Sequence, residues 1–229
     1  MTTTTTLLHI DASPRSGRSG AVVHGSHSRR LSHHFVSTWQ AARPHDEVIY
    51  RDFGIAPPQA VTGDWIHSAY TPTEAREPWM HEVLAESNTF IAELRRADVI
   101  VMGTPMYNYS APATVKAWID NIVRVGETFD MDPSLDDPYV PLLAERPRRT
   151  VLLTAHGSSG FGPGGMQAHL NFLVPGVKAA LGLVGLREVH DIAVEHAEDR
   201  GDLLERSMAE ALSGIEQLVR DLQAKVQAG

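Results

Sequence analysis

The sequence predicts a three-layer α/β sandwich in which helices cover both faces of a five-stranded parallel sheet. Short apolar runs alternate with segments of helical period along the chain, which is typical of βαβ units. Two of these runs are continuously apolar, as expected of parallel strands that are covered on both faces. No second core is indicated, so we expect the 229 residues to form a single domain.

The five expected strands cover residues 7–11, 47–52, 98–103, 150–155 and 188–194. The third and fourth are the continuously apolar runs, so they belong in the interior of the sheet. The fifth alternates between polar and apolar residues, which predicts an edge strand with a more exposed face.

Helices are expected where apolar residues recur with a period of 3.6. These segments are residues 31–39, 80–96, 115–122, 171–183 and 204–226. Pro175 is compatible with the fourth helix because it lies in the first turn, where its missing N–H costs no hydrogen bond.

Three segments do not fit the repeat. Residues 1–6 carry no apolar run, and we expect them to form a disordered tail. Residues 55–78 and 126–149 are rich in proline and are expected to be long irregular excursions. They contain aromatic residues such as Trp65 and Tyr139, which argue against disorder. We therefore expect these two excursions to form a pocket rim or a subunit contact.

Composition excludes several classes of function. The 20 Lys and Arg against 28 Asp and Glu give a net charge of −8, which disfavours a nucleic-acid partner. The absence of Cys excludes disulfides, thiolate metal sites and cysteine nucleophiles. No apolar run approaches the roughly 20 residues that span a bilayer, and the N-terminus lacks the pattern of a signal peptide. We expect a cytoplasmic protein without a membrane partner.

The first candidate site segment follows the first strand. In an open parallel sheet, ligands bind at the carboxyl ends of the strands, where the strand order reverses. Residues 11–28 bring serines and glycines to a helix N-terminus, a combination that favours a phosphate group. Ser13, Ser26 and Ser28 are expected to donate their hydroxyls and Arg15 or Arg18 to add positive charge, unless a serine here only caps the helix. The Gly-Lys-Ser/Thr of a P-loop is absent, so a nucleoside triphosphate is not indicated.

The second segment follows the third strand. Met106, Tyr107 and Tyr109 offer a flat, polarisable surface, and the amide of Asn108 offers a donor and an acceptor. This combination suits a planar heterocycle with amide-like edges. The alternative is that these aromatic residues only close the top of the core.

The third segment follows the fourth strand. Gly157 and Ser158 are expected to direct backbone N–H groups at the far edge of the same ring, where they would stabilise negative charge on the reduced ring. For His156, both a chemical role and simple exposure to solvent remain open.

Three other patterns are rejected. Residues 160–165 match G-x-G-x-x-G, but they lie several residues beyond the strand and contain a proline, so they do not predict a dinucleotide site. The histidines at positions 24, 27, 33 and 34 lack the spacing of metal ligands, and no metal is expected. No Gly-x-Ser-x-Gly elbow of a serine hydrolase is present.

Over nearly all its length, the chain resembles the FMN-dependent NADH azoreductases and NAD(P)H quinone oxidoreductases of flavodoxin-like fold. Pro-Met-Tyr-Asn-Tyr at residues 105–109 is similar to the family's Pro-Met-Tyr-Asn-Phe flavin-ring motif. Ser13 matches the first serine of the phosphate loop, and Ser-His-Ser at residues 26–28 matches the family's Ser-x-Ser. Thr-Ala-His-Gly-Ser at residues 154–158 stands where the family has Thr-Ser-Arg-Gly-Gly.

The resemblance implies a homodimer that binds FMN, accepts hydride from NADH or NADPH, and reduces quinones or azo compounds by a ping-pong mechanism. It implies neither a catalytic side chain nor a metal, because the flavin carries the chemistry. The residues implied in cofactor binding are Ser13, Ser26, His27, Ser28, Met106, Tyr107, Asn108, Tyr109, Ala155, His156, Gly157 and Ser158.

The chain departs from the family in its first loop, which is longer and places Ser19 as a rival ligand of the phosphate. Ala155 lacks the family's hydroxyl, His156 replaces an arginine and Ser158 a glycine. Two other functions remain open: an electron-transfer protein that docks a protein partner, and a quinone reductase specialised for a biosynthetic substrate.

Overall fold

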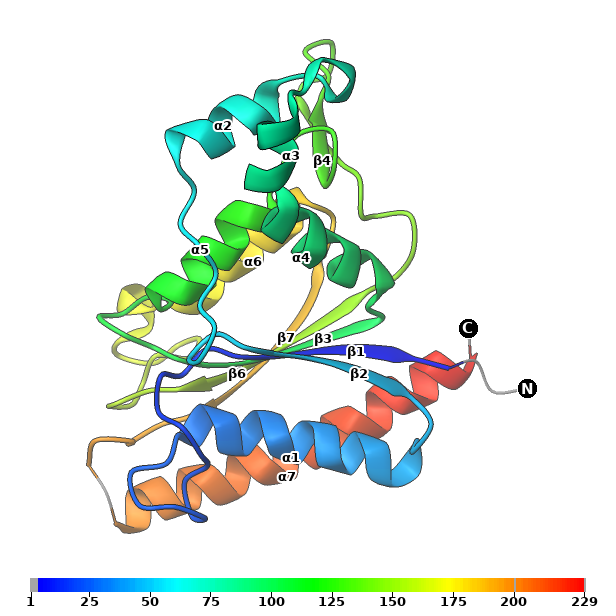
Figure 1. Cartoon of the computed structure of the whole chain (residues 1–229). Helices are drawn as coiled ribbons and strands as arrows, with labels where there is room; N and C mark the ends of the chain where they lie inside the picture. The colour runs from blue at the N-terminus through cyan, green and yellow to red at the C-terminus, as the bar shows by residue number, and fades with distance from the viewer. Residues whose placement is uncertain (1–3, 200, 229) are drawn as a thin grey trace.

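The computed structural model describes residues 4–199 and 201–228, and it has the predicted three-layer sandwich (Figure 1). Its five-stranded parallel sheet has the order β2-β1-β3-β6-β7. This order confirms that the third and fourth predicted strands, β3 and β6, are interior and that the fifth, β7, is an edge strand. The strands are β1 (Thr6–Asp11), β2 (Glu47–Asp52), β3 (Val99–Pro105), β6 (Arg149–Ala155) and β7 (Glu188–Val194).

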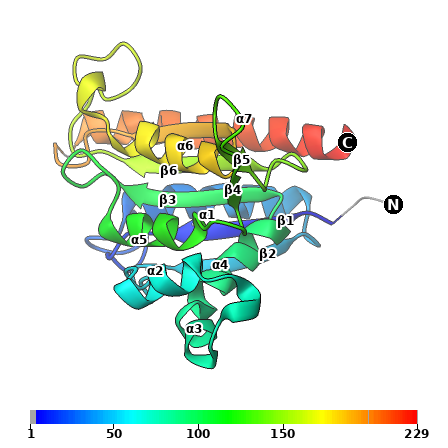
Figure 2. The ribbon, with the colours of Figure 1, turned by 90° about the horizontal axis from the view of Figure 1, so that it is seen from above.

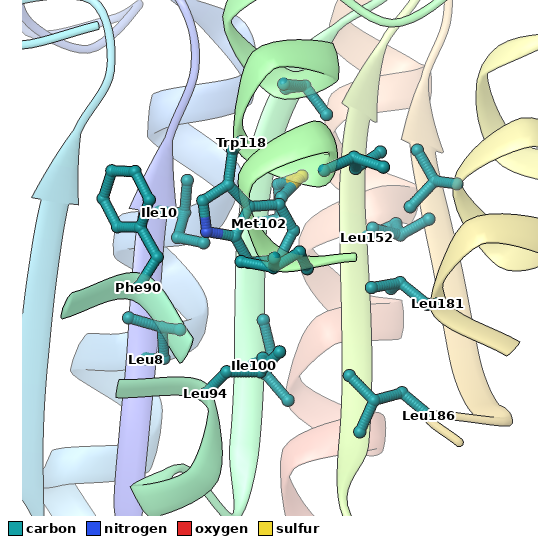
Figure 3. Close-up of a cluster of buried hydrophobic side chains, with 14 of the residues drawn as sticks. Leu8, Ile10, Phe90, Leu94, Ile100, Met102, Trp118, Leu152, Leu181 and Leu186 are labelled. Carbon is teal, nitrogen blue, oxygen red and sulfur yellow. The ribbon is translucent and has the colours of Figure 1, made fainter. Parts of the chain in front are cut away.

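Helices cover both faces of the sheet (Figures 1 and 2). One face is covered by α4 (Ala85–Arg96), α5 (Ala113–Ile122) and α6 (Leu173–Leu183), and the other by α1 (His27–Ala42) and α7 (Asp202–Ala228). Each strand alternates its side chains between the two apolar cores. Figure 3 shows Trp118 of α5 packed over Ile10 and Met102 in the first core.

The prediction of one continuous helix over residues 80–96 is wrong, because two helices cover this segment. The chain forms α3 (Pro78–Val83) and α4, which are separated at Leu84. Leu84 has φ −88° and ψ 0° and is buried against Trp65 and Ala69. Packing against the preceding segment therefore interrupts a helix that the apolar period alone would continue.

The two excursions contain more regular structure than predicted. The first forms α2 (Gly63–Tyr70), whose N-terminus is capped by the Thr62 hydroxyl, and the 3₁₀-helix η1 (Thr73–Ala75). The second forms an antiparallel hairpin of β4 (Phe129–Met131) and β5 (Tyr139–Pro141). In Figure 1, α2, α3 and β4 project from the α4 and α5 side of the sheet. The irregular conformation expected here is wrong, whereas the argument against disorder is confirmed.

The expected disordered tail is wrong for Thr5 and Thr6. Thr6 opens β1 and pairs with Glu47, while Thr5 is buried and its N–H donates to the Asp46 carboxylate at 3.0 Å. Residues 1–3 lie outside the described residues. Among the described helices none has the length and apolarity that a bilayer span requires, since the long α7 is amphipathic.

We predict that Trp118→Ala lowers the free energy of unfolding by about 3–5 kcal/mol, because it leaves a large cavity in a packed core. Trp118 is 1% exposed, and its ring centroid lies 6.4 Å from that of Phe53. Urea unfolding followed by circular dichroism measures the change. Trp79→Ala in the projecting α3 is the control and should cost less than about 1 kcal/mol. Equal losses in the two variants would contradict this assignment of the core.

Candidate functional site

Three loops meet at the carboxyl edge of the sheet, on the left in Figure 1. The chain passes from β1 outward to β2 and then returns to β3 on the other side, so the strand order reverses between β1 and β3. The Ala12 N–H donates to the Gly103 carbonyl at 2.9 Å, and the Met106 N–H donates to the Ala155 carbonyl at 2.9 Å. These bonds hold the loops after β1, β3 and β6 together at the position where open sheets of this order bind ligands.

The predicted serines of the first loop gather at the N-terminus of α1. Ser13, Ser26 and Ser28 are all buried, and the hydroxyls of Ser26 and Ser28 lie 3.1 Å apart. Ser26 is the N-cap and accepts a hydrogen bond from the Arg29 N–H at 3.3 Å. The N–H groups of His27 and Ser28 reach no acceptor within the described part of the chain, as is usual in a first helical turn.

The extra length of this loop forms a closed bulge. The Ser26 N–H donates to the Gly17 carbonyl, and the Ser19 N–H donates to the Ser26 carbonyl, both at 3.0 Å. These bonds close the bulge at its base, so that Ser26 keeps its place at the helix N-terminus. Ser19 instead lines a hollow beside α1, together with Arg30 and His33, and its hydroxyl oxygen is buried. Its position therefore favours Ser26 and Ser28 over Ser19 as phosphate ligands.

Buried Arg29 joins the first loop to the ends of two strands. Its guanidinium donates to both Asp52 carboxylate oxygens, at 2.5 and 2.7 Å, and to the Ser13 carbonyl at 2.7 Å. It also reaches Asp11 at 3.4 Å, and Tyr50 donates its hydroxyl to the same carboxylate at 3.0 Å. One cation, Arg29, thus faces the two carboxylates of Asp11 and Asp52. These three side chains together add no net positive charge to the site.

The pKa values in this group follow from these contacts. Burial raises the pKa of Asp52, but the hydrogen bond and the charge of Arg29 outweigh burial, and the pKa lies below its ordinary value. The pKa of Arg29 is raised, first by its hydrogen bond to Asp52. Burial raises the pKa of Tyr50, and the neighbouring Asp11 raises it further. Arg29 is therefore charged, Asp52 is ionised at neutral pH, and Tyr50 keeps its proton.

The segment after β3 forms a two-residue turn in an unusual conformation. Asn108 and Tyr109 have φ of 48° and 67°, the left-handed region that glycine normally occupies in such turns. Tyr107 and Ser110 exchange backbone hydrogen bonds at 2.9 and 3.0 Å across it. Two consecutive left-handed residues without glycine are strained, and strain of this kind is concentrated at functional sites.

This turn presents the predicted ring-binding side chains. Tyr107 and Tyr109 are 41% and 47% exposed, whereas Met106 packs partly against the core. The alternative in which both tyrosines only close the core is therefore wrong. The Tyr109 carbonyl accepts the Phe172 N–H at 2.9 Å, which ties the turn to the start of α6.

The segment after β6 offers backbone donors at the same edge. The N–H groups of Gly157 and Ser158 have no acceptor among the residues described, and the Ser158 side chain is exposed. The carbonyl of Gly157 accepts the Glu198 N–H at 3.0 Å, and this bond fixes the orientation of the loop.

His156 is buried, so the interpretation of a solvent-exposed loop histidine is wrong. It is 2% exposed, with Nε2 3.1 Å from the Thr154 hydroxyl and its ring centroid 5.3 Å from that of Phe161. Burial lowers its pKa, although the nearby charge of Glu195 opposes the shift. Its side chain lines a cavity of about 670 Å³ between α6 and β7.

Parts of the rejected glycine and histidine patterns lie beside these loops, since Gly160 and Phe161 line the cavity next to His156 and His27 begins α1. Residues 160–165 lead into the 3₁₀-helix η2 (Ala168–Leu170) and do not open a helix directly after a strand, unlike a dinucleotide fingerprint. No three His, Asp or Glu side chains gather as metal ligands within the described ranges.

Comparison with known proteins identifies the family of this chain. A family model described as "Flavodoxin-like fold" matches residues 5–219. The chain belongs to this flavodoxin-like family. A relative from Colwellia psychrerythraea, named FMN-dependent NADH:quinone oxidoreductase 2, is 37% identical over 218 residues, covering 95% of this chain and 99% of the relative. A Pseudomonas aeruginosa relative, named FMN-dependent NAD(P)H:quinone oxidoreductase 1, is 39% identical over 218 residues, covering 93% and 98%.

Solved structures show the same flavodoxin-like fold. An azoreductase from Bacillus anthracis has a TM-score of 0.81 at 21% identity, covering 95% of this chain and 99% of that chain. An FMN complex of an FMN-dependent NADH-azoreductase from the same species has a TM-score of 0.80 at 16% identity, covering 95% and 99%.

Sequence reasoning missed Arg29, Tyr50 and Asp52 in this flavodoxin-like chain. Their role depends on side chains from α1 and β2 that meet only in the folded protein. The one signal available was the pair of aspartates at the ends of two neighbouring strands, Asp11 and Asp52, which would need a shared cation if both were buried.

We predict that Arg29→Met lowers the free energy of unfolding by about 3–5 kcal/mol at neutral pH, because it leaves Asp11 and Asp52 without their cation. Because the pKa of Asp52 is lowered in the folded state, this stabilisation is present above the unfolded pKa of about 3.9 and is lost as the pH falls below it. Urea unfolding between pH 3 and 7 tests both statements. Arg30→Met is the matched control and should change stability by less than about 0.5 kcal/mol. A loss of stability in Arg29→Met that does not shrink towards low pH would refute the ionic explanation.

Proposed function

We propose that this protein is an FMN-dependent oxidoreductase that passes electrons from NADH or NADPH to quinones or azo compounds. The observation that carries the proposal is that three elements lie at the same carboxyl edge of the sheet. They are the serine-lined N-terminus of α1, the exposed turn at residues 107–110, and the N–H groups of Gly157 and Ser158, which have no acceptor among the described residues. The names of the relatives from C. psychrerythraea and P. aeruginosa support the same activity.

The N-terminus of α1 fits the phosphate of FMN. This N-terminus offers an anion the neutral donors that such a site requires. They are the hydroxyls of Ser13, Ser26 and Ser28 and the N–H groups of His27 and Ser28, which reach no acceptor among the described residues. The charge of Arg29 is already neutralised by Asp11 and Asp52. In this proposal Arg29 therefore positions the loop and does not bind the phosphate.

The loops after β3 and β6 fit the isoalloxazine ring. Met106, Tyr107 and Tyr109 would contact the face of the ring, and the Asn108 amide would bond to its polar edge. The backbone of Ala155 would also contact the ring. The N–H groups of Gly157 and Ser158 would face the edge where negative charge develops on reduction. His156 would support this segment through its bond to Thr154.

When bound, FMN would supply two-electron chemistry for hydride transfer from NADH or NADPH and for reduction of the acceptor in a second half-reaction, in a ping-pong sequence. The residues of the chain would bind and orient the flavin and polarise its ring. No side chain is assigned as a general base, and the pKa of His156 is lowered by burial, so this residue is neutral at pH 7.

We further propose a cytoplasmic homodimer. The excursions carry the exposed apolar side chains that a subunit contact would cover, since Tyr70 is 67% and Tyr139 48% exposed. A hollow of about 280 Å³ joins the two excursions, with Trp65 and Phe129 in its wall. A cytoplasmic location fits the pyridine nucleotide donor.

Steady-state kinetics of FMN-loaded protein test the activity. NADH oxidation should depend on an added quinone, and double-reciprocal plots at several quinone concentrations should be parallel. Intersecting lines would contradict the ping-pong sequence, and no oxidation with any quinone or azo dye would contradict the proposed function. Slow oxidation that a separate reductase accelerates would favour the electron carrier.

We predict that Ser28→Ala raises the Kd for FMN about 10- to 100-fold, since a hydrogen bond to a charged group contributes about 1.5–3 kcal/mol. The Kd for riboflavin, which lacks the phosphate, should not change. Fluorescence titration measures both constants. Ser37→Ala, on the exposed side of the same helix, is the control. Equal weakening of FMN and riboflavin binding would disprove the phosphate assignment.

We predict that Asn108→Gly raises the Kd for both FMN and riboflavin about tenfold, because the ring loses one hydrogen-bonding amide. Glycine keeps the left-handed φ of 48°, so the turn survives the change, whereas alanine would add strain. Ser110→Ala, at the end of the same turn, should leave both constants unchanged. An unaltered flavin affinity in Asn108→Gly would mean that the ring does not contact this turn.

A further inference from the structure

A basic hollow of about 320 Å³ lies between the long first loop, α1 and α7. Its wall includes Arg18 and Ser19 from the loop and Arg30, His33 and His34 from α1. Ser13, Ser26 and Ser28 do not line it, so it is separate from the site proposed for the FMN phosphate.

The two arginines of this hollow lack acidic partners. Arg18 and Arg30 are both half-buried, and neither forms an ion pair with a carboxylate in residues 4–199 or 201–228. His34, which also lines the hollow, contacts the Glu216 carboxylate at 3.2 Å. Two like charges in one hollow repel each other, and an anion bound between them would relieve this repulsion. The two guanidinium groups therefore favour an anion from outside the chain.

The hydroxyl of Ser19 adds a neutral donor at the hollow. The Ser19 hydroxyl is buried and has no hydrogen-bond partner within the described part of the chain. Gly20 has φ +83°, and a Cβ at this position would lie 3.2 Å from Nη1 of Arg30. Glycine thus lets the guanidinium lie against the loop backbone. Because the bonds of Ser26 to Gly17 and Ser19 close the bulge, these donors are held in place.

A second hollow of about 410 Å³ shares Arg18 and His33 with the first. Its wall holds His9, which is 7% exposed and whose Nε2 lies 3.6 Å from the Asp11 carboxylate. Asp11 also lines it and accepts hydrogen bonds from Ser32 and Tyr50. The second hollow therefore continues the basic hollow as far as the paired side chains of His9 and Asp11.

We propose that the basic hollow binds the phosphate group of a small molecule, at a site separate from that of FMN. Guanidinium groups match phosphate oxygens in geometry and charge, and the hydroxyl of Ser19 supplies a third donor. Such a group reaches the hollow as free phosphate or as the 2′-phosphate of NADPH. The NADPH alternative rests on the function proposed above.

Calorimetric titration of FMN-saturated protein with inorganic phosphate tests the site, because FMN then blocks the N-terminus of α1. We expect one phosphate to bind. We expect Arg30→Gln to weaken phosphate binding at least tenfold without changing the Kd for FMN. Arg187→Gln removes an equal charge at the opposite edge of the sheet and should change the phosphate Kd less than twofold.

A kinetic comparison distinguishes the two sources of phosphate. If the 2′-phosphate of NADPH occupies the hollow, Arg30→Gln raises the KM for NADPH about tenfold and leaves that for NADH unchanged. If both KM values are unchanged while phosphate binding is lost, the hollow takes free phosphate.

Two results would overturn the proposal: no phosphate binding by the wild-type protein, or equal binding by wild type and Arg30→Gln. Neither result bears on FMN, whose binding is measured separately with Ser28→Ala and riboflavin. Failure of the second phosphate site is therefore distinguishable from failure of the proposed oxidoreductase.

Discussion

The placement of α1 and of the loop after β1 depends on the ion pair between buried Arg29 and Asp52. This guanidinium connects α1 to the end of β2, and through the Ser13 carbonyl it fixes the loop that follows β1. Because Arg29 lies in the first turn of α1, the same contact orients the helix whose N-terminus faces the candidate phosphate position. Without this cation, two aspartates at adjacent strand ends would repel each other where the loops must converge.

This arrangement determines how the protein handles negative charge. The cation nearest the serines is already neutralised by carboxylates, so the proposed FMN phosphate relies on hydroxyls, backbone N–H groups and the helix N-terminus. Arg18 and Arg30, which have no carboxylate partner among the described residues, lie beside the helix in the basic hollow instead. The long first loop thus separates the two proposed anion sites, one of which offers neutral donors and the other charged guanidinium groups.

The sequence predicted the sheet because its strands carry unambiguous local signals, namely continuous apolar runs at β3 and β6 and alternation at β7. It also predicted which loops meet, since a parallel sheet brings the carboxyl ends of its strands to one edge. It failed where distant packing decides the outcome, as in the break at Leu84 and the burial of His156. The Arg29 network was missed because its members are unremarkable in isolation and become a unit only when α1 lies against β1 and β2.

A crystal structure of the protein with FMN would locate both ends of the cofactor. We expect the phosphate at the N-terminus of α1, within hydrogen-bond distance of Ser26 and Ser28, and the ring between the turn at residues 107–110 and the Gly157–Ser158 N–H groups. A phosphate held by Arg18 and Arg30, or a ring that does not contact the turn at residues 107–110, would contradict this expectation.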